Sequence, residues 1–317
     1  DEDMAPNMVW IKKRSNTGGH IITDSVRGAG KHLFGNLNNA EATYAQFLTS
    51  FDTDGFAVGN DAEINQSSQT YASWNWKAGG SASSNSNGSI TSSVSANTTA
   101  GFSIVSWTGS GSSATIGHGL SATPKLIIVK NRTDSVNWFL YNHSIITAGA
   151  SNKSFMTLNE TDALGTNGTA TTFTSVSDTT FGIGTDNIIN GSSDNMIAYV
   201  FSEKKGFSKF LKYTGNGDNN FIYTGFKPSF LMVKASSATS AWYIYDNKRA
   251  GYNPDNNQLY PDRNNAEDTT DQVDFLSNGF KWQGITGDPN TSGRTYIYIA
   301  FAESPFVTST GIPTTAR

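Results

Sequence analysis

The chain repeats one pattern of hydrophobic and polar positions three times. Each copy begins with a proline, a short apolar run and a lysine, at residues 6–14, 124–132 and 228–236. About 65 to 75 residues later, each copy closes on an aromatic-rich apolar run, at residues 70–76, 195–201 and 295–301. A fixed period of this kind defines the folding unit. We therefore expect three related modules, in which positions shared by all copies serve the architecture.

Within a copy, short runs of β-branched and aromatic residues alternate with clusters of Gly, Asn, Asp and Ser, which is the pattern of strands and turns. The second copy has about seven such runs between residues 101 and 201. No window keeps the 3.6-residue apolar period of an amphipathic helix. Strands at this spacing predict an antiparallel sandwich or a small barrel. The predicted fold is therefore all-β, built from tandem antiparallel β-sandwich or small-barrel modules.

The repeats also predict where the modules begin and end. The first copy lacks the Gly-Phe-Ser run that opens the other two, so its module is incomplete. The predicted segments are an incomplete module at 1–80, a linker at 81–100, a second module at 101–205, a third module at 206–305 and a tail at 306–317. The linker contains 15 Ser, Thr, Asn or Gly out of 20 residues. This composition predicts a flexible connector, although residues 89–94 could pair as an edge strand.

A module without its first strand has an unpaired sheet edge, which is an aggregation hazard. We hypothesise that upstream chain, or a strand from a neighbouring subunit, completes the first sheet. The chain begins with Asp1 rather than Met, which indicates a removed leader or a longer polypeptide.

Composition narrows the range of functions. Charged residues make up only 15% of the chain and the net charge is −4, which does not fit the basic surface of a nucleic-acid binder. The absence of cysteine excludes disulfides and thiolate metal sites. No run approaches the roughly 20 apolar residues of a membrane span. We therefore expect neither a nucleic-acid partner nor a membrane span.

Two copies share an Asp-x-x-Arg pair, formed by Asp24 and Arg27 in the first copy and by Asp246 and Arg249 in the third. The second copy replaces both members at once, with Asn142 and Ile145. Joint loss predicts that the two residues work together as a structural salt bridge or turn lock. The alternative is a pair that contacts a sugar or a carboxylate.

A second shared element is Asn-Asn-Ala-Glu, which ends at Glu41 in the first copy and at Glu267 in the third. Asn side chains bond the backbone nearby, so this element predicts loop architecture. The two glutamates could serve a divalent cation, but no calcium-loop spacing is present. We therefore expect no metal site.

Three tryptophans occur in single copies, with smaller aliphatic residues at the matching positions: Trp10, Trp74 and Trp282. Aromatic side chains on loops offer large contact area at low entropy cost. We predict these three as ligand contacts, with core filling as the alternative.

Catalytic patterns are weak throughout. None of the four histidines has HExxH spacing, and neither a GxSxG elbow nor a Walker loop occurs. No acid pair recurs between copies, although glycosidase carboxylates are set by geometry rather than spacing. We expect no enzymatic activity and no cofactor.

Several of these motifs together resemble a known class of proteins. They are Pro-x-Leu-Ile-Ile-Val-Lys-x-Arg at 124–132, Trp-x-x-Tyr, Asn-Gly-Phe, and Thr-Tyr-Ile-Tyr-x-Ala-Phe-Ala-Glu-x-Pro at 295–305. The combination resembles bacteriophage virion proteins of marine tailed phages, which are described as tail-fibre or virion structural proteins. The resemblance spans nearly the whole chain but brings no catalytic residue set.

The resemblance implies a β-rich appendage on the surface of a phage particle, assembled as a homotrimer or higher oligomer. Its partners would be other virion proteins and a host-surface glycan or protein receptor. Two alternatives stay open at this point. One is a self-assembling capsid decoration or extracellular filament protein without a ligand, and the other is a polysaccharide-degrading tailspike.

Overall fold

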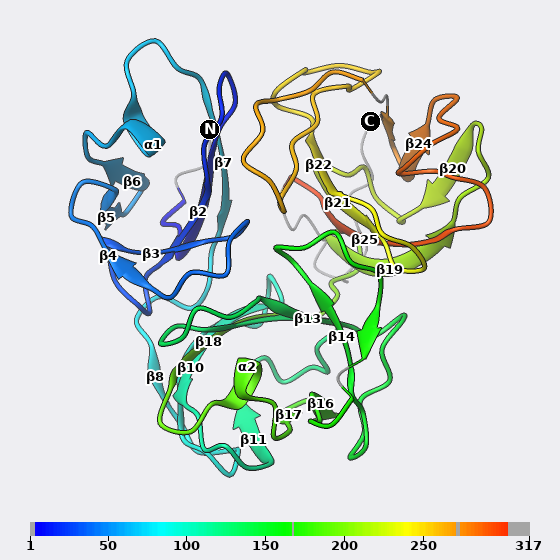
Figure 1. The fold of residues 1–317 in the computed structure, drawn as a ribbon. Coiled ribbons are helices and arrows are strands. Elements are labelled where there is room, and N and C mark those ends of the chain that lie inside the picture. The colour runs from blue at the N-terminus through cyan, green and yellow to red at the C-terminus, as the bar shows by residue number, and fades with distance from the viewer. Residues whose placement is uncertain (1–3, 167, 271–272, 304–317) are drawn as a thin grey trace.

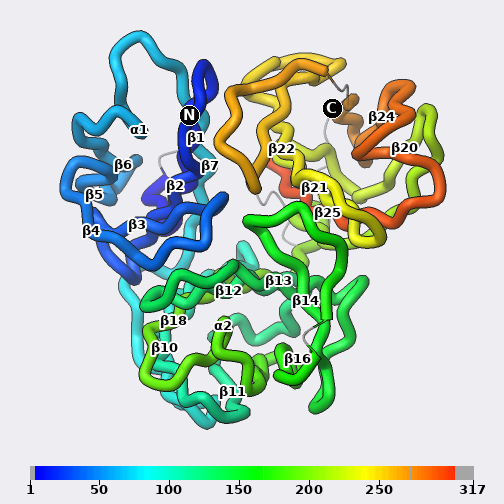
Figure 2. Tube along the Cα trace, viewed as in Figure 1, coloured from blue at the N-terminus to red at the C-terminus, as the bar shows by residue number. Residues whose placement is uncertain are grey.

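The structure is a computed structural model that describes residues 4–166, 168–270 and 273–303. Strands account for 42% of the structure and helices for 3%, which confirms the prediction of an all-β fold. The strands form antiparallel sheets that belong to three modules, and the modules surround a common centre (Figures 1 and 2). We name them module 1 (β1 to β7), module 2 (β8 to β18) and module 3 (β19 to β25).

Module 1 has a five-stranded sheet and a hairpin. The sheet has the order β4-β3-β2-β1-β7, with β1 (Met8–Lys13), β2 (His20–Asp24), β3 (Lys31–Phe34), β4 (Ala42–Thr43) and β7 (Tyr71–Trp76). The hairpin consists of β5 (Leu48–Asp52) and β6 (Gly55–Val58), and the short helix α1 (Ala62–Asn65) follows it. Side chains of the hairpin and of α1 pack on the outer face of the sheet, which makes a two-layer unit.

Module 2 has an eight-stranded sheet in the order β15-β14-β13-β12-β18-β10-β9-β8 and a small sheet in the order β11-β17-β16. The large sheet contains β8 (Ser83–Asn85), β9 (Ser92–Asn97), β10 (Phe102–Thr108), β12 (Leu126–Asn131), β13 (Phe139–Asn142), β14 (Ser154–Thr157), β15 (Gly165–Thr166) and β18 (Asn195–Phe201). The small sheet contains β11 (Ala114–Gly117), β16 (Phe173–Val176) and β17 (Thr180–Ile183), with helix α2 (Asn187–Asn190) after it.

Module 3 repeats this plan with fewer strands. Its main sheet has the order β19-β25-β21-β22 and its small sheet the order β20-β24-β23. The elements are β19 (Ser208–Thr214), β20 (Asn220–Tyr223), β21 (Phe230–Ala235), β22 (Trp242–Asp246), β23 (Val273–Leu276), β24 (Gly279–Trp282) and β25 (Thr295–Phe301).

The strand registers identify which residues of the three copies are equivalent. The proline-led strands β1, β12 and β21 each pair antiparallel with the closing strand of their own module. Their first residues lie opposite Trp76, Phe201 and Phe301, respectively. The ring centroid of Phe301 is 5.8 Å from that of Trp76 and 5.6 Å from that of Phe201. These three equivalent rings therefore meet where the modules come together.

Alternation along β1 and β21 divides their core residues between two clusters, whereas the buried apolar residues of β12 all belong to one cluster. In β1, Val9 and Ile11 belong to the cluster of module 1 alone, whereas Met8 and Trp10 belong to a cluster that runs through all three modules. The same division holds in β21, where Leu231 and Val233 face the small sheet of module 3. Successive strand residues point to opposite faces, so each main sheet has one face toward its own small layer and one toward the centre. The modules therefore share one hydrophobic core.

The prediction of a flexible linker at 81–100 is wrong. Residues 83–85 and 92–97 form β8 and β9, which extend the main sheet of module 2 beyond β10. A β-ladder is made by backbone groups, so a run of Ser, Thr and Asn joins it when a well-packed neighbour such as β10 offers a free edge. The predicted pairing of residues 89–94 is correct only in part, because β9 begins at Ser92 and Ile90 makes a single bridge to Ile116. The predicted tail at 306–317 lies outside the described residues.

Module 1 is incomplete in the way the repeats predict. β18 and β25 are each paired on both sides, whereas β7 pairs only with β1 among the described strands. The small layer is also shorter. A Cβ on Gly279 would lie 2.2 Å from the Ile222 carbonyl of β20, whereas a Cβ on the equivalent Gly55 would meet no atom within 4 Å. The space that β20 fills in module 3 is therefore open in module 1.

The open edge of β7 has a defined set of unpaired backbone groups. The backbone N–H of Arg14 donates to the Thr70 carbonyl at 2.8 Å. In an antiparallel ladder this register directs the groups of Tyr71, Ser73 and Asn75 away from β1. Completion of this sheet by upstream chain or by a neighbouring subunit stays a prediction.

If a neighbouring subunit supplies the missing strand, we expect Ser73→Pro to convert the oligomer to a monomer. Proline removes one outward N–H without affecting the bonds between β7 and β1. Light scattering measures the solution mass, and Ser73→Ala, which keeps the N–H, is the matched control. A wild-type monomer, or an oligomer that Ser73→Pro leaves intact, would contradict a strand supplied by a neighbour.

Candidate functional site

The three modules contact one another in a closed cycle, and two of these contacts use a tryptophan at or next to the start of the strand that pairs with the proline-led strand. In module 2, Trp138 Nε1 donates to the Phe34 carbonyl of module 1 at 2.9 Å. In module 3, Trp242 Nε1 donates to the Thr157 carbonyl of module 2 at 2.9 Å. Module 1 has His20 at this position, opposite Lys12 in β1. The histidine is the smallest of the three rings.

His20 is buried and makes a different set of contacts. Its Nδ1 accepts a hydrogen bond from Trp10 Nε1 at 2.9 Å, which places the ring proton on Nε2. Nε2 faces the Tyr260 carbonyl of module 3 but does not reach hydrogen-bond geometry. Burial, reinforced by the charge of Lys12, holds the pKa of His20 well below its ordinary value, so the ring is neutral.

An ionic network joins module 1 to module 2. Asp24 and Arg27 form a salt bridge whose side chains are 0% exposed, which confirms the predicted pair. Tyr199 of module 2 donates its hydroxyl to Asp24 at 2.8 Å. Glu41 accepts two hydrogen bonds from Arg132 of module 2, both at 2.8 Å, and contacts Arg27 at 3.3 Å. Two carboxylates thus balance two guanidinium groups across the interface.

The same network joins module 3 to module 1. Arg249 binds Asp246 at 2.7 Å, which confirms the second predicted pair. Trp74 Nε1 of module 1 donates to Asp246 at 3.0 Å. Glu267 contacts Arg249 at 2.7 Å and Arg14 of module 1 at 2.8 Å. Burial raises the pKa of Glu267, but the hydrogen bonds from Arg14 and Arg249 outweigh this effect and leave the pKa lowered, so the glutamate stays ionised.

The interface between modules 2 and 3 replaces every member of this network with an uncharged residue. The Glu41 and Glu267 backbone N–H groups each donate across an interface at 2.8 Å, and Leu164 makes the equivalent bond to Ser236 at 2.9 Å. The strand registers and this backbone bond identify the residues equivalent to the network. All five are uncharged, and they are Asn142, Ile145, Leu164, Ser236 and Ile299. Module 3 presents Ile299 where the other interfaces have a hydrogen-bonding ring, so an Asp in the second copy would have no ring donor to pair with.

The prediction that Trp10, Trp74 and Trp282 contact a ligand needs correction. Their exposed fractions are 2%, 8% and 0%, so none of them offers a free surface. Trp10 and Trp74 pack edge to face in the shared core, with ring centroids 6.0 Å apart. Trp282 fills the core of module 3 and donates to the Tyr213 hydroxyl at 3.1 Å. Neighbouring modules and layers cover positions that look exposed when one copy is considered alone.

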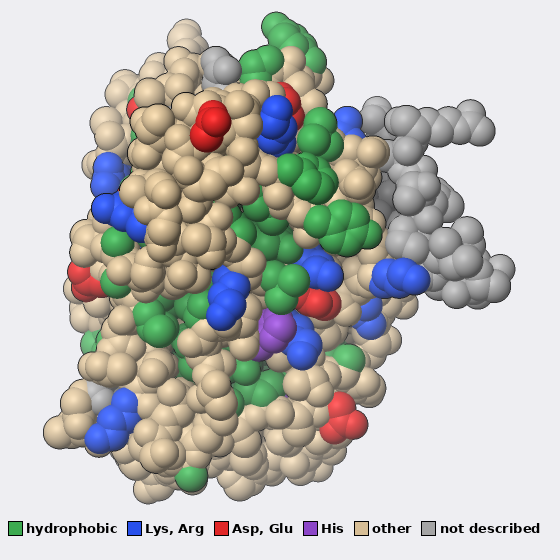
Figure 3. All heavy atoms as spheres, turned by 90° about the vertical axis from the view of Figure 1, so that its right-hand side faces the viewer, with side chains coloured by type: hydrophobic (Ala, Val, Ile, Leu, Met, Phe, Trp, Pro, Cys, Tyr) green, Lys and Arg blue, Asp and Glu red, His purple; other side chains and the backbone are tan. Residues whose placement is uncertain are grey.

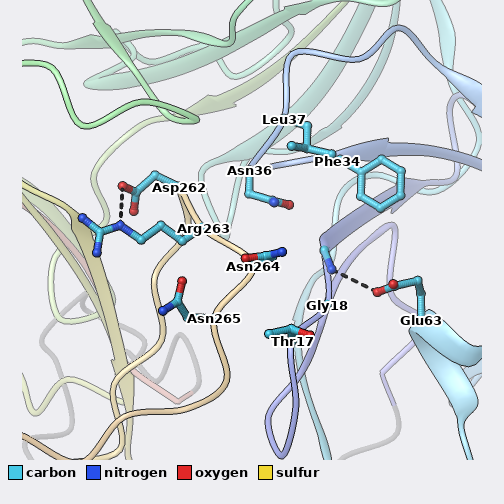
Figure 4. Close-up of a pocket in the computed structure, with 11 residues that line it drawn as sticks. Thr17, Gly18, Phe34, Asn36, Leu37, Glu63, Asp262, Arg263, Asn264 and Asn265 are labelled. Atoms are coloured by element: carbon cyan, nitrogen blue, oxygen red, sulfur yellow. Dashed lines mark hydrogen bonds and ion pairs between the residues drawn. The ribbon is translucent and has the colours of Figure 1, made fainter.

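A cleft of about 580 Å³ lies at the interface of modules 1 and 3 (Figure 4). It is lined from module 1 by Thr17, Gly18, Gly19, Phe34, Asn36, Leu37 and Glu63 and from module 3 by Asp262, Arg263, Asn264 and Asn265. At the two other interfaces a tryptophan ring spans to the neighbouring carbonyl. Module 1 has the smaller His20 at this position, and its Nε2 makes no hydrogen bond within the described residues.

Asn36 and Asp262 hold equivalent positions on opposite sides of the cleft. Asn36 Oδ1 accepts the backbone N–H of His20 at 2.8 Å, and Asp262 Oδ1 accepts that of Trp242 at 3.0 Å. Within the described part of the chain, Asn36 Nδ2 has no hydrogen-bond partner. Asp262 Oδ2 is buried without a hydrogen bond and lies 3.6 Å from Arg263 Nε. Burial raises the pKa of Asp262 to about 6.

The floor of the cleft is fixed by backbone contacts. Glu63, at the start of α1, accepts the Gly19 N–H at 3.0 Å, and the Gly18 N–H donates to the Asn264 carbonyl at 2.9 Å. A Cβ on Gly18 would come within 2.8 Å of the Glu63 carboxylate, so a larger residue here would displace that side chain. The loop of module 1 and the loop of module 3 are therefore held together beneath the cleft.

The cleft is lined by hydrogen-bond donors, hydrogen-bond acceptors and one apolar surface. Amide side chains of Asn264 and Asn265 lie on one side, as Figure 4 shows, and Leu37, which is 41% exposed, lies on the other. Amides donate and accept, carboxylates accept, and Arg263 donates. This arrangement fits a ligand rich in hydroxyl groups, each of which both donates and accepts.

Sequence reasoning missed these cleft residues because it looked for tryptophans present in one copy. The useful signal was the opposite one, a tryptophan present in two copies and replaced by His20 in the third. The change of the shared Asn36 position to Asp262 in module 3 was a second signal.

The described residues were compared with the requirements of a metal site and of a membrane-spanning helix, and they meet neither. In the described ranges no three His, Asp or Glu side chains gather so that they could hold a metal ion. Glu41 and Glu267 each bind arginine side chains. No helix of the described residues is long and apolar enough to cross a membrane.

Residues 2–305 match the family described as a domain of unknown function, DUF7483, and the chain belongs to this family. No curated protein matches the chain, and no solved structure matches it. The match covers all three modules, in agreement with their shared core.

Proposed function

We propose that this member of the DUF7483 family is a non-enzymatic structural protein of a bacteriophage virion, and that its cleft between modules 1 and 3 binds a glycan of the host surface. The resemblance of its repeats to tail-fibre and virion structural proteins supports the virion role. The closed cycle of modules around one core supports a rigid scaffold. Placement on the particle surface, as a tail fibre or similar appendage, follows from the same resemblance.

The observation that carries the binding role is the cleft itself. It lies between two modules, and Asp262 Oδ2 is buried beside it without a hydrogen bond in the described part of the chain. Buried polar groups are normally hydrogen-bonded, so an unpaired one calls for an explanation. A saccharide hydroxyl would pair with Asp262 Oδ2 or Asn36 Nδ2. A weak single site would still give strong attachment if several copies bind at once.

A glycan array probed with the intact protein tests the binding role. We expect at least one bacterial surface polysaccharide to bind, and the double variant Arg263→Ala, Asn265→Ala to bind it at least tenfold more weakly. Loss of a hydrogen bond to a charged group costs about 1.5 to 3 kcal/mol, and 1.4 kcal/mol is about tenfold. Both side chains are exposed, so the fold tolerates their removal.

The matched control is the double variant Asn38→Ala, Asn39→Ala, which alters exposed residues of the neighbouring loop outside the cleft lining. Equal binding by the cleft variant and wild type would remove the cleft from the proposal. Shortened products after incubation with the bound polysaccharide would replace it with a polysaccharide-degrading role.

A further inference from the structure

A second, smaller hollow lies on module 3, away from the interface cleft. Its volume is about 290 Å³, and its lining consists of Lys227, Asn247, Gly251, Tyr252, Asn253, Asp255 and Phe275. Ligand pockets for drug-sized molecules have roughly 300 to 1,000 Å³. This hollow is therefore of a size for a single sugar ring or a ligand of similar bulk.

Tyr252 stands over the hollow on a segment that is firmly attached. The ring is 81% exposed, the largest value among the large hydrophobic side chains of the described residues. Next to it, the Asn253 side chain donates to the Phe275 carbonyl at 3.0 Å and accepts the Phe275 N–H at 2.9 Å. Asp255 and Val273 exchange two backbone hydrogen bonds of 2.8 Å. An exposed aromatic ring on a pinned segment is a preformed stacking surface.

Asp255 supplies a buried acceptor without a partner. The residue is 1% exposed, and its Oδ1 accepts the Asn257 N–H at 3.0 Å. Its Oδ2 is buried and makes no hydrogen bond within the described part of the protein. An unsatisfied buried acceptor costs about 1 to 3 kcal/mol, and a ligand hydroxyl would remove that cost. Burial raises the pKa of Asp255 to about 6, so the side chain is mainly ionised at pH 7.

Two donors complete the set. Asn247 Oδ1 accepts the Ser229 hydroxyl at 2.8 Å, which leaves its Nδ2 available as a donor. The Lys227 side chain is on an exposed residue that also lines the hollow. The corresponding loops of the other modules, at 28–30 and 146–153, contain no aromatic residue. The constellation thus belongs to module 3 alone.

The surrounding surface agrees with a contact region. Hydrophobic side chains gather in the upper half of the face shown in Figure 3, over module 3, close to several Lys and Arg side chains. Module 3 contributes three of the five large hydrophobic side chains that are exposed in the described structure, namely Phe221, Tyr223 and Tyr252.

We propose that this hollow is a second saccharide subsite, in which Tyr252 stacks on the apolar face of one sugar ring, Asp255 accepts from a hydroxyl, and Asn247 and Lys227 donate to neighbouring oxygens. The choice of ligand class rests on the proposed function, whereas the location rests on the hollow alone. Together with the interface cleft it would give each chain two contacts with one polysaccharide.

Saturation-transfer NMR on the intact chain tests the subsite. The probes are methyl α-glucopyranoside, methyl β-galactopyranoside, methyl α-mannopyranoside and N-acetylglucosamine. We expect transfer to at least one probe, and at least tenfold weaker binding by Tyr252→Ala. The matched control is Tyr223→Ala, which removes a tyrosine that is 62% exposed in the same module but outside the hollow.

A pH series separates recognition by Asp255 from stacking alone. A carboxylate accepts from a hydroxyl, and protonation removes part of that capacity. Binding is therefore expected to weaken as the pH falls from 7 to 5, and Asp255→Asn should bind more weakly at pH 7 and lose this dependence. Equal pH profiles of Asp255→Asn and wild type would overturn the role of the carboxylate.

No transfer to any probe, or unchanged binding by Tyr252→Ala, would overturn the subsite. The Arg263→Ala, Asn265→Ala variant keeps the two proposals apart. Loss of array binding in that variant, with Tyr252→Ala unaffected, would refute the subsite and leave the interface cleft in place. The reverse result would refute the interface cleft only.

Discussion

Replacing Arg27 with methionine is expected to lower the free energy of unfolding by about 3 to 5 kcal/mol. The guanidinium is 0% exposed and lies between Asp24 and Glu41. Methionine keeps most of the volume but leaves Asp24 buried without its counter-charge. Removal of one partner from a buried pair is costly because the other charge stays in a region of low dielectric. Urea unfolding at pH 7, followed by tryptophan fluorescence, measures the loss.

The chain contains its own control for this experiment, because the interface of modules 2 and 3 has the same geometry without charges. The control variant installs that set in the interface of modules 1 and 2 through Asp24→Asn, Arg27→Ile, Glu41→Leu, Arg132→Ser and Tyr199→Ile. We expect these five changes together to cost less than Arg27→Met alone, since no charge is left unpaired. A cost larger than that of the single change would contradict the view that the five positions act as one unit.

Raising the pH from 8 to 10 is expected to stabilise the protein. Lys12, Lys130 and Lys234 hold equivalent positions and are 0% to 1% exposed, and burial lowers the pKa of each from 10.5 to about 8. Between pH 8 and pH 10.5 the lysines of the unfolded chain keep protons that the three buried lysines of the folded chain have released. The free energy of unfolding rises with pH wherever the unfolded state binds more protons. One pKa unit corresponds to about 1.4 kcal/mol, so each lysine contributes at most about 3 kcal/mol over the full interval.

Urea unfolding at pH 8, 9 and 10 measures this slope. Lys130→Met should lose about one third of the slope attributable to the three lysines, whereas Lys77→Met, at an exposed position, should keep all of it. The window ends near pH 10 because buried tyrosines act in the opposite direction above it. Burial raises the pKa of Tyr199 well above 10, so ionisation of the unfolded tyrosine favours unfolding. Stability that falls between pH 8 and 10 would contradict the burial of neutral lysines.

Lys12, Lys130 and Lys234 show why a residue can recur in all three copies. Lys130 Nζ donates to the Asn131 carbonyl at 2.6 Å and Lys234 Nζ to the Ala235 carbonyl at 3.0 Å, and Lys12 makes the same bond to Lys13. The side-chain nitrogen of each lysine thus binds the backbone carbonyl of the next residue, near the end of its own strand. Lys234 also donates to Thr161 of module 2 at 3.0 Å. The residue recurs because the strand end recurs, which is an architectural role.

The difference between the interfaces fixes which module lies beside which. Each buried Asp–Arg pair is matched by a neighbouring module that supplies an aromatic hydrogen-bond donor, Tyr199 or Trp74, and a second arginine. Module 3 offers Ile299 and Ser236 instead, and only the uncharged set of module 2 matches them. Pairing an ionic face with the uncharged one would bury an unpaired charge, which disfavours any other order.

The repeat predicted much of this arrangement before any contact was known. The three aligned apolar runs correctly predicted the strands β1, β12 and β21, because β-branched runs bounded by turn residues favour strands. The joint loss of Asp and Arg in the second copy correctly predicted two salt bridges. The missing first run correctly predicted the unpaired edge of β7.

Other features lay beyond the reach of a single copy. Trp74 is buried because Phe230 and Asp246 of module 3 contact it. Trp10 packs against the Trp74 ring. Residues 92–97 have the composition of a linker, and they form β9 because β10 offers its edge. The cleft joins Asn36 to Asp262, which are far apart in the chain and meet only when the cycle of modules closes.

The sequence by itself determined the number of modules, their all-β character and the incomplete first sheet, because these depend on local patterns and on the period of the repeat. Only the tertiary structure decided which surfaces are buried, which interfaces are ionic and where the clefts lie. Those properties depend on contacts between modules. Local sequence does not identify which residues of a neighbouring module a side chain will contact.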